Sequence, residues 1–445
     1  MLEVLNTLLW GLGTLALILG TGAWLTLRTG GFPQRNLGRA LALSLGREAR
    51  RKGRGGVSPL GSLMTALAST VGTGNIVGVA AALVSGGPGA LVWMELAAFL
   101  GLAAKFAECM LAVKYRRVRR DGTRWGGPMA VMETRLGSAG AVLGRFYALF
   151  ALLMAFAMGA MAQSGALADT FSAAFTLPRW RVGLVTAALA LTILLGGIRR
   201  IADISTVLVP VMALLYLGGG LAVILGNLRR LPEAVTLMLR CAVASEAALG
   251  GALGIVTRRE ALRWGVARSV FSNEAGLGSA AITAACADTE DPVRQGLISM
   301  TGVFFDTMVI CAVTGLAICC SGTLGAADGN GRPLTGAALT LRAFETVLGP
   351  LAPWLIGVAL GLFAFTSVLG CAVQAETTAS YLLGPEAARP CRVLYGLAVF
   401  AGAVIPMATV LQLADLANAL MAFPNLVCLL LLSDEIAGEC RRKDR

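Results

Sequence analysis

Long runs without a charged residue alternate with short basic segments along this chain. Runs such as 5–27, 204–228 and 393–414 are about long enough for a helix to cross a ~30 Å hydrocarbon core. A basic loop, and no small-residue cleavage site, follows the first run, so we expect it to remain as a helix rather than be removed as a signal peptide. The pattern predicts an all-α polytopic membrane protein of about 11 helices, near residues 5–28, 58–84, 88–113, 141–171, 182–198, 203–228, 245–285, 295–320, 350–383, 393–409 and 411–433.

Two of these expected helices carry glycine pairs flanked by small and polar residues, TVGTGNIVG at 70–78 and FSNEAGLGSAAITAAC at 271–286. Gly72 and Gly276 are 204 residues apart, and the same offset brings the later helices of the first set onto or close to helices of the second. Because each set has five helices, the second set enters the membrane from the opposite side. This predicts an inverted repeat, about 58–228 and 245–433, within one transmembrane domain of 1–445. Two unrelated helix-packing segments are the alternative.

The first glycine segment is a candidate binding site. Each glycine in a helix interior costs roughly 1 kcal/mol relative to alanine, and Gly72, Thr73, Gly74 and Asn75 are clustered at the centre of the expected span. An unwound turn there would offer N–H groups to a carboxylate and carbonyls to a cation. Gly74 and Gly78 also fit helix-packing spacing, which is the alternative.

In the second segment, Gly276 and Gly278 predict a similar unwound turn facing the ligand. Glu274 has a competing interpretation, because Ser272 or Asn273 could cap a half-helix that begins near Ala275.

Other polar residues fall inside apolar runs. Thr366 and Ser367 supply the hard oxygen atoms that suit an alkali cation, although both hydroxyls could instead bond the carbonyl four residues earlier. Gln163 and Asp306 are intramembrane polar residues and therefore functional candidates. Asp306 could equally pair with an arginine or a backbone N–H group.

Composition narrows the class. Only 14% of the residues are charged, and the net charge of +12 is concentrated in basic loops, which the positive-inside rule places in the cytoplasm. The expected topology has the N-terminus outside and the C-terminus inside, with residues 229–268 and their seven arginines fitting least well. Nucleic acid is therefore not an expected partner. The chain has no histidine and no C-x-x-C pair, which argues against zinc sites and Cys–His or Ser–His catalysis.

Five stretches carry a resemblance to a known family: STVGTGNIVGVAAAL, GGPGALVWMELAAFLGLAAKFAE, GGIRRIADISTVLVPVMALLY, RSVFSNEAGLGSA and GVFFDTMVICAVTG. They resemble the alanine or glycine:cation symporter (sodium:alanine symporter) family, and the similarity covers roughly residues 5–435. That family is similar in fold to leucine-transporter-type sodium symporters. The resemblance therefore implies a five-plus-five inverted repeat with one additional N-terminal helix.

The resemblance also implies roles for individual residues. The turn at Gly72, Thr73 and Gly74 would bind the amino-acid carboxylate, and Asn75 would approach a coupling ion or the substrate. A sodium site would combine the carbonyls of Ala68 and Val71 with the hydroxyls of Thr366 and Ser367, while Gln163 would face the pocket.

The chain departs from the family pattern where a substrate side chain would lie. An aromatic-rich run is replaced by a segment that contains Cys371, Val373 and Gln374. Cys371 and Gln374 share a helix face at this spacing, so we expect both near the substrate, with Gln374 favouring a small polar amino acid.

These observations predict a transporter of the cell membrane and no enzyme: a symporter that imports a small neutral amino acid (alanine, glycine or serine) with sodium by alternating access. Sodium is the transported coupling ion, and the lipid bilayer is the other partner. A proton-coupled carrier is the alternative, for which Asp306 or Glu376 would have to titrate. A membrane sensor or enzyme would need a soluble domain, and no loop is long enough to supply one.

Overall fold

Helices make up most of the chain in the computed structural model, which describes residues 9–51, 57–118, 122–244, 246–250, 254–329 and 331–444. Up to residue 230 the elements are α2 (Leu12–Arg28), α3 (Phe32–Arg35), α4 (Leu37–Leu45), η1 (Arg47–Arg50), α5 (Pro59–Thr70), η2 (Thr73–Asn75), α6 (Val77–Gly86), α7 (Gly89–Lys114), β1 (Arg117–Val118), β2 (Arg124–Trp125), α8 (Pro128–Arg135), α9 (Gly137–Met154), η3 (Ala155–Ala162), α10 (Gln163–Phe175), α11 (Arg179–Leu194), α12 (Gly197–Gly226) and η4 (Leu228–Arg230).

The remaining elements begin with an amphipathic helix and end with a short polar one. They are α13 (Leu231–Val243), β3 (Glu246–Gly250), β4 (Gly254–Thr257), α14 (Arg258–Asn273), α15 (Ser279–Ala285), α16 (Pro292–Val303), η6 (Phe304–Cys311), α17 (Ala312–Ser321), α18 (Gly336–Leu348), η7 (Gly349–Leu351), α19 (Ala352–Leu383), η8 (Pro385–Ala387), α20 (Ala388–Val404), α21 (Met407–Leu431) and α22 (Ser433–Asp444). The strands form two antiparallel pairs, β1 with β2 and β3 with β4.

Among the described residues, seven helical spans are long and apolar enough to cross a membrane, or eight if the bent pair α5 and α6 counts as one. The chain is therefore built as a multi-pass membrane protein. The expected number of about 11 spans stays a prediction, because α2 and α11 are only 17 and 16 residues long, and the pair α14 and α15 is interrupted.

Both glycine segments interrupt their helices. The axes of α5 and of the helix that follows differ by 62° across the break at 71–72. In the second segment α14 ends at Asn273, and Glu274, Gly276 and Gly278 all adopt positive φ angles before α15 begins. Glycine tolerates that backbone region at little cost, whereas Glu274 does so only because its surroundings hold it there.

The expected span at 245–285 begins later than its hydropathy indicates. Strands β3 and β4 occupy part of 246–257, and the helix starts only at Arg258. Thr257 caps this helix, since its hydroxyl accepts from the Glu260 N–H while the Glu260 carboxylate accepts from the Thr257 N–H. This reciprocal capping fixes the start of the helix. It corrects the boundary expected from the apolar run.

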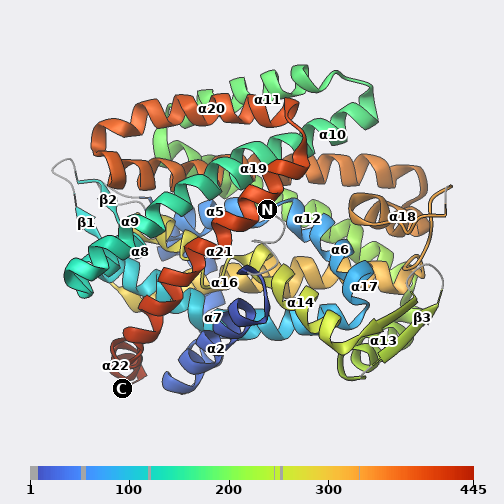
Figure 1. The fold of residues 1–445 in the computed structure, drawn as a ribbon, viewed down its shortest axis with the longest axis horizontal. Coiled ribbons are helices and arrows are strands. Elements are labelled where there is room, and N and C mark those ends of the chain that lie inside the picture. Colours follow the sequence, from blue (N-terminus) through green and yellow to red (C-terminus); the bar gives the residue numbers. More distant parts are fainter. Residues whose placement is uncertain are drawn as a thin grey trace.

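Figure 1 shows which elements lie at the two ends of the long axis of the molecule. The β1–β2 pair, α8 and α22 lie at one end of this axis, and α13, α18 and the β3–β4 pair lie at the other. Helix α7 is packed against α14, α15 and α16, while α19 contacts α5, α10 and α12. The glycine breaks therefore lie within the helix assembly rather than at its surface, and most of their residues are buried.

Close helix packing generates a stability prediction. At Gly265 of α14, an added Cβ would lie 2.3 Å from the Ala90 carbonyl oxygen of α7, whereas no atom lies within 4 Å of a Cβ at Gly357 of α19. We expect Gly265→Ala to destabilise the protein by about 1–3 kcal/mol through overpacking. Gly357→Ala should be neutral or slightly stabilising, because alanine favours the helix. Thermal melting in detergent tests this, and an unchanged midpoint for Gly265→Ala would contradict the close approach of α7 and α14.

Candidate functional site

The first break forms a polar centre where helices α5 and α6 meet. Gly72 has an extended backbone, and its N–H donates to the Asn75 side-chain oxygen over 2.9 Å. Helix α6 begins two residues after Asn75, so the break lies at a helix N-terminus with its partial positive charge. The turn is thus held open by the asparagine side chain rather than by continued helix hydrogen bonds.

Gly72 lies directly beside α19 and the start of α10. An added Cβ at Gly72 would lie 2.8 Å from the Ser367 hydroxyl and 3.5 Å from the Gln163 side-chain nitrogen. The Thr73 hydroxyl donates to the Gln163 side-chain oxygen over 3.3 Å. The structure therefore brings Gly72, Thr73, Gln163 and Ser367 together, as the expected site requires.

A group of oxygen atoms at this position could hold a cation. The Ser367 hydroxyl donates to the Phe363 carbonyl over 2.9 Å and lies 3.4 Å from the Val71 carbonyl across the break. The Thr366 hydroxyl also reaches the Phe363 carbonyl, at 3.1 Å. Carbonyl and hydroxyl oxygens are the hard ligands that an alkali cation takes. The Phe363 carbonyl was not among the expected ligands, because its contribution follows from the helix geometry and not from the residue type.

The two hydroxyls have different surroundings. Each hydroxyl donates to the carbonyl four residues earlier, that of Leu362 for Thr366 and that of Phe363 for Ser367. Hydrogen bonds within the helix, the alternative to a cation site that the sequence allowed, are therefore present as well. Ser367 faces the break, whereas Thr366 contacts the Met212 sulfur of α12 at 3.3 Å. Ala68 is buried on α5, next to the point where Gly370 of α19 packs tightly against the α5 backbone.

Asn75 connects the first break to two further helices. Its fully buried amide nitrogen donates to the Asp306 carboxylate over 2.8 Å and lies 3.1 Å from the Ser272 hydroxyl. The Asp306 carboxylate also accepts from Ser272 at 2.6 Å and from Thr307 at 2.9 Å. Asp306 therefore has uncharged hydrogen-bond partners, and it lies in the π-helical segment η6. Asn75 and Ser272 join the two glycine segments at this carboxylate.

The second break is organised around Glu108 of α7. The N–H groups of Gly276 and Gly278 donate to one oxygen of the Glu108 carboxylate over 3.2 and 3.0 Å. The side-chain nitrogen of Asn425 on α21 donates to the same oxygen over 3.1 Å. Lys105, one turn earlier on α7, has its ammonium 3.5 Å from the other oxygen of Glu108. All five residues belong to a buried cluster outside the first break.

The remaining candidate residues take several positions. The expected helix start near Ala275 is instead at Ser279, and the Glu274 carboxylate accepts from the Ser279 hydroxyl. Cys371 packs against Gly159 of η3. Gln374 belongs to α19 and faces α5, where its amide nitrogen is 3.3 Å from the Ser69 hydroxyl, and its amide oxygen is buried without a partner among the described residues. Gln374 is thus the better placed of these two for a ligand beside α5.

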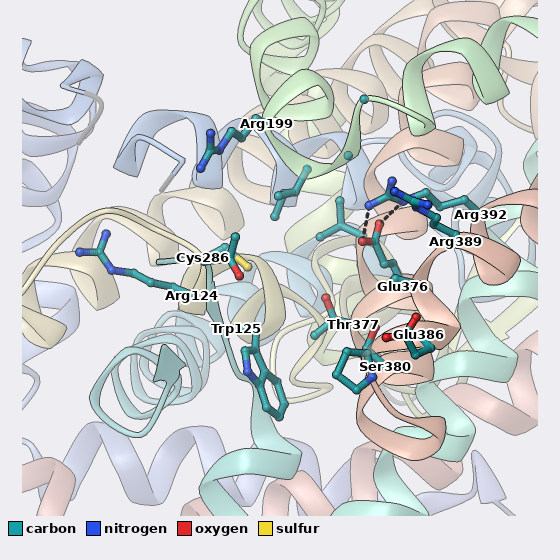
Figure 2. A pocket seen from close by; sticks show the side chains of 17 residues that line it. Arg124, Trp125, Arg199, Cys286, Glu376, Thr377, Ser380, Glu386, Arg389 and Arg392 are labelled. Carbon is teal, nitrogen blue, oxygen red and sulfur yellow. Dashed lines mark hydrogen bonds and ion pairs between the residues drawn. The ribbon is translucent and has the colours of Figure 1, made fainter. Parts of the chain in front are cut away.

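A cavity of about 620 Å³ opens along the second half of α19 (Figure 2). Its lining reaches Val373, next to Gln374 in the chain. Near its rim Glu376 accepts two hydrogen bonds from Arg392 of α20, at 2.6 and 2.8 Å. Its other walls come from β2, the start of α12 and Cys286, just beyond α15. The cavity therefore lies between β2 and the second half of α19, and its lining reaches Val373 but not Gln374.

Sequence reasoning missed Lys105, Glu108 and Asn425. The signal was present, because Lys105 and Glu108 are two charged residues three positions apart within a largely apolar helix. Intramembrane charges of this kind mark functional or pairing positions. Their partner, the backbone of the second break, could not be identified without the fold.

A family profile and two relatives indicate the same class of protein. A profile of the sodium:alanine symporter family matches residues 1–442. The sodium/alanine symporter AgcS of Methanococcus maripaludis is 40% identical over 443 residues, which cover 99% of this chain and 96% of AgcS. YrbD of Bacillus subtilis, whose assigned name puts it forward as a sodium/proton-dependent alanine carrier, is 33% identical over 96% of this chain and 89% of its own. Among solved structures, a mutant of the Eremococcus coleocola manganese transporter has a TM-score of 0.47 at 13% identity, over 85% of this chain and 78% of that one.

The family and its named members are transporters and not enzymes. The match extends over nearly every residue, and the similarity to AgcS far exceeds what fold alone would require. This chain belongs to the sodium:alanine symporter family.

Proposed function

We propose that the protein imports a small neutral amino acid together with sodium, and that both bind at the first glycine break. The observation that carries this proposal is the contact of Gly72 with Ser367 and Gln163. A carboxylate at the turn would receive backbone N–H groups at the start of η2 and α6, and the amides of Gln163 and Gln374 would contact the rest of the substrate. Sodium would bind the carbonyls of Ala68, Val71 and Phe363 and the hydroxyls of Ser367 and Thr366.

The two ligands would bind cooperatively, because the cation and the substrate carboxylate carry opposite charges and share one turn of backbone. Little water is present between buried groups, so their attraction is stronger there than in bulk solvent. Such coupling is reciprocal: sodium raises the affinity for the amino acid by the factor by which the amino acid raises the affinity for sodium. This coupling of the two ligands needs no covalent chemistry.

We further infer a five-plus-five inverted repeat of residues 58–228 and 245–433, which follows helix α2 in the sequence. We also infer that the protein lies in the plasma membrane with its C-terminus in the cytoplasm. The interruption of both α5–α6 and α14–α15 supports the repeat. The cavity beside Val373 opens at the end that carries basic residues such as Arg124 and Arg389, and we assign it as the cytoplasmic route from the site.

Proton coupling is the second candidate function, and the position of Asp306 favours it. Its carboxylate is buried beside Asn75 and has uncharged partners. A buried carboxylate of this kind could bind the coupling proton. Sodium remains the first choice, because the oxygen ligands around Ser367 need no titrating group.

The first prediction separates the two hydroxyls. Ser367→Ala should raise the sodium concentration for half-maximal uptake by about ten- to hundredfold, as expected for the loss of a ligand worth ~1–3 kcal/mol. Thr366→Ala should have the smaller effect, because the Thr366 hydroxyl lies against Met212. Sodium titration of alanine uptake in proteoliposomes measures both. Equal sodium dependence in the parent and both variants would show that the hydroxyls serve only as helix hydrogen bonds.

The second prediction concerns the backbone approach at Gly72. Gly72→Ala places a methyl group 2.8 Å from the Ser367 hydroxyl, which costs roughly 1–3 kcal/mol and corresponds to about five- to hundredfold weaker substrate binding. Gly218→Ala on α12, where a Cβ has no neighbour within 4 Å, is the control. Binding is measured by competition in purified, monodisperse protein. Unchanged affinity in Gly72→Ala would place the substrate elsewhere.

The third prediction distinguishes sodium from proton coupling. With a sodium gradient the parent should accumulate alanine, and with only a proton gradient in sodium-free buffer it should not. Asp306→Asn should keep sodium-driven uptake, because the amide oxygen can still accept from Asn75 and the Ser272 and Thr307 hydroxyls can turn to accept. Proton-driven uptake in the parent that disappears in Asp306→Asn would favour the second candidate function.

A further inference from the structure

The C-terminal helix α22 is bound to several distant parts of the chain by ion pairs. At its start, Asp434 pairs with Arg28 at the end of α2. At its end, Asp444 pairs with Arg35 of α3 at 3.1 Å, and Lys443 pairs at 2.6 Å with Asp291, the residue that caps α16. We call these three the outer pairs. They connect α22 to elements more than 150 residues away in the sequence.

Glu435 is the centre of a second, more sheltered group of contacts. Its carboxylate accepts from Lys114 of α7 at 2.6 Å, from the Tyr115 hydroxyl and from Arg135 of α8 at 3.1 Å. Lys114 also pairs with Glu439, one turn further along α22, at 2.7 Å. The Glu435 side chain is 17% exposed, whereas Asp434 in the outer pairs is 78% exposed. Solvent and salt therefore reach the outer pairs far more readily than Glu435.

The contacts of Glu435 join α22 to the ends of two helices that are far apart from it in the sequence. Lys114 ends α7, and Arg135 ends α8. In a transporter that works by alternating access, helices move relative to one another. A helix that ties the ends of α7 and α8 at one carboxylate restrains any movement of one of these ends relative to the other. The apolar face of α22 (Ile436, Ala437 and Cys440) is buried, so the helix is seated on the protein rather than extended into solvent.

We propose that α22 is an ionic-strength-sensitive strap: at low salt it holds the ends of α7 and α8 together and slows transport, and higher salt releases it. This inference rests on the proposed function for its effect on transport, but the opening of the strap does not. Exposed ion pairs weaken as salt shortens the screening length from ~30 Å at about 0.01 M to ~3 Å at about 1 M. Loss of the outer pairs leaves a 12-residue helix held only by Glu435, Glu439 and its buried face.

Acid does not act as the releasing signal near neutral pH. Partial burial acts to raise the pKa of Glu435, but hydrogen bonds from Lys114 and Tyr115 outweigh it and leave this pKa below its ordinary value. Likewise, the pKa of Asp291 is lowered, since its bond from Lys443 outweighs the effect of burial. A carboxylate with a lowered pKa keeps its contribution until the pH falls through that value. Ionic strength is therefore the variable that acts on the ionised strap.

Cys440 provides a direct readout, because it lies on the buried face of α22 and is only 1% exposed. The parent protein in nanodiscs is treated with a maleimide at about 0.01 M and about 1 M choline chloride, and modification of Cys440 is followed by peptide mass spectrometry. The test variant is Asp434→Asn/Lys443→Gln/Asp444→Asn, which removes the outer pairs. The control is Glu345→Gln, which removes the exposed Arg342–Glu345 pair of α18.

We expect salt to accelerate Cys440 modification in the parent and the control by about three- to tenfold, the range for several exposed pairs. The test variant should react rapidly at both salt concentrations. Sodium-driven alanine uptake in proteoliposomes, with choline chloride equal on both sides, should follow the same pattern. Salt-independent modification in the parent, or a test variant that matches the parent, would overturn the strap. Salt-dependent modification with salt-independent uptake would overturn its control of transport. Salt-dependent modification without uptake of any small amino acid would count against the proposed function and leave the opening of the strap supported.

Discussion

A helix that is interrupted in a membrane must find new partners for the backbone groups that it frees, because hydrocarbon supplies none. The two glycine breaks meet this requirement in different ways. The first is closed by its own Asn75, whose other amide atom reaches Asp306 and Ser272. The second is closed by Glu108, which is supplied by a different helix and takes two backbone N–H groups. The rest of the site depends on these arrangements.

Because of this difference, the two breaks differ in the groups that they can offer to a ligand. The N–H groups of Gly276 and Gly278 are already engaged by an internal carboxylate, and a Cβ would meet Leu426 at Gly276 and Pro128, Tyr147 and Asn425 at Gly278. Around Gly72 the neighbours are instead polar side-chain ends, the Ser367 hydroxyl and the Gln163 amide. Those neutral groups can rearrange around a small zwitterion. The expectation that both glycine pairs serve the substrate directly therefore has its stronger physical support at the first pair.

The sequence was most informative where it violated the requirements of an ordinary apolar helix. Gly72, Thr73 and Asn75 cost helix stability without improving packing, and this contrast predicted the first break before any fold was known. Ser367 was found for the same reason, as a hydroxyl in an apolar run. Two kinds of feature could not be found this way. The Phe363 carbonyl has no signature in residue type, and Asn425 meets Glu108 only because α21 packs beside α7, 317 residues apart in the sequence. The late start of α14 was also hidden, because hydropathy does not register a capping pair such as Thr257 and Glu260.

The placement of Lys105 and Glu108 has a consequence for the biosynthesis of the protein. Helix α7 is made and inserted long before the second break and Asn425 emerge from the ribosome, so Glu108 at first lacks its three N–H partners. A lone charge at the centre of an inserting helix costs about 3 kcal/mol. Lys105 lies one turn from Glu108 on the same helix and pairs with it, so it can offset the charge of Glu108 before the later helices are made. In the folded protein the Lys105 ammonium also donates to the Glu274 carbonyl over 3.2 Å. One lysine can thus act as the counter-ion of Glu108 during insertion and as part of the assembled core.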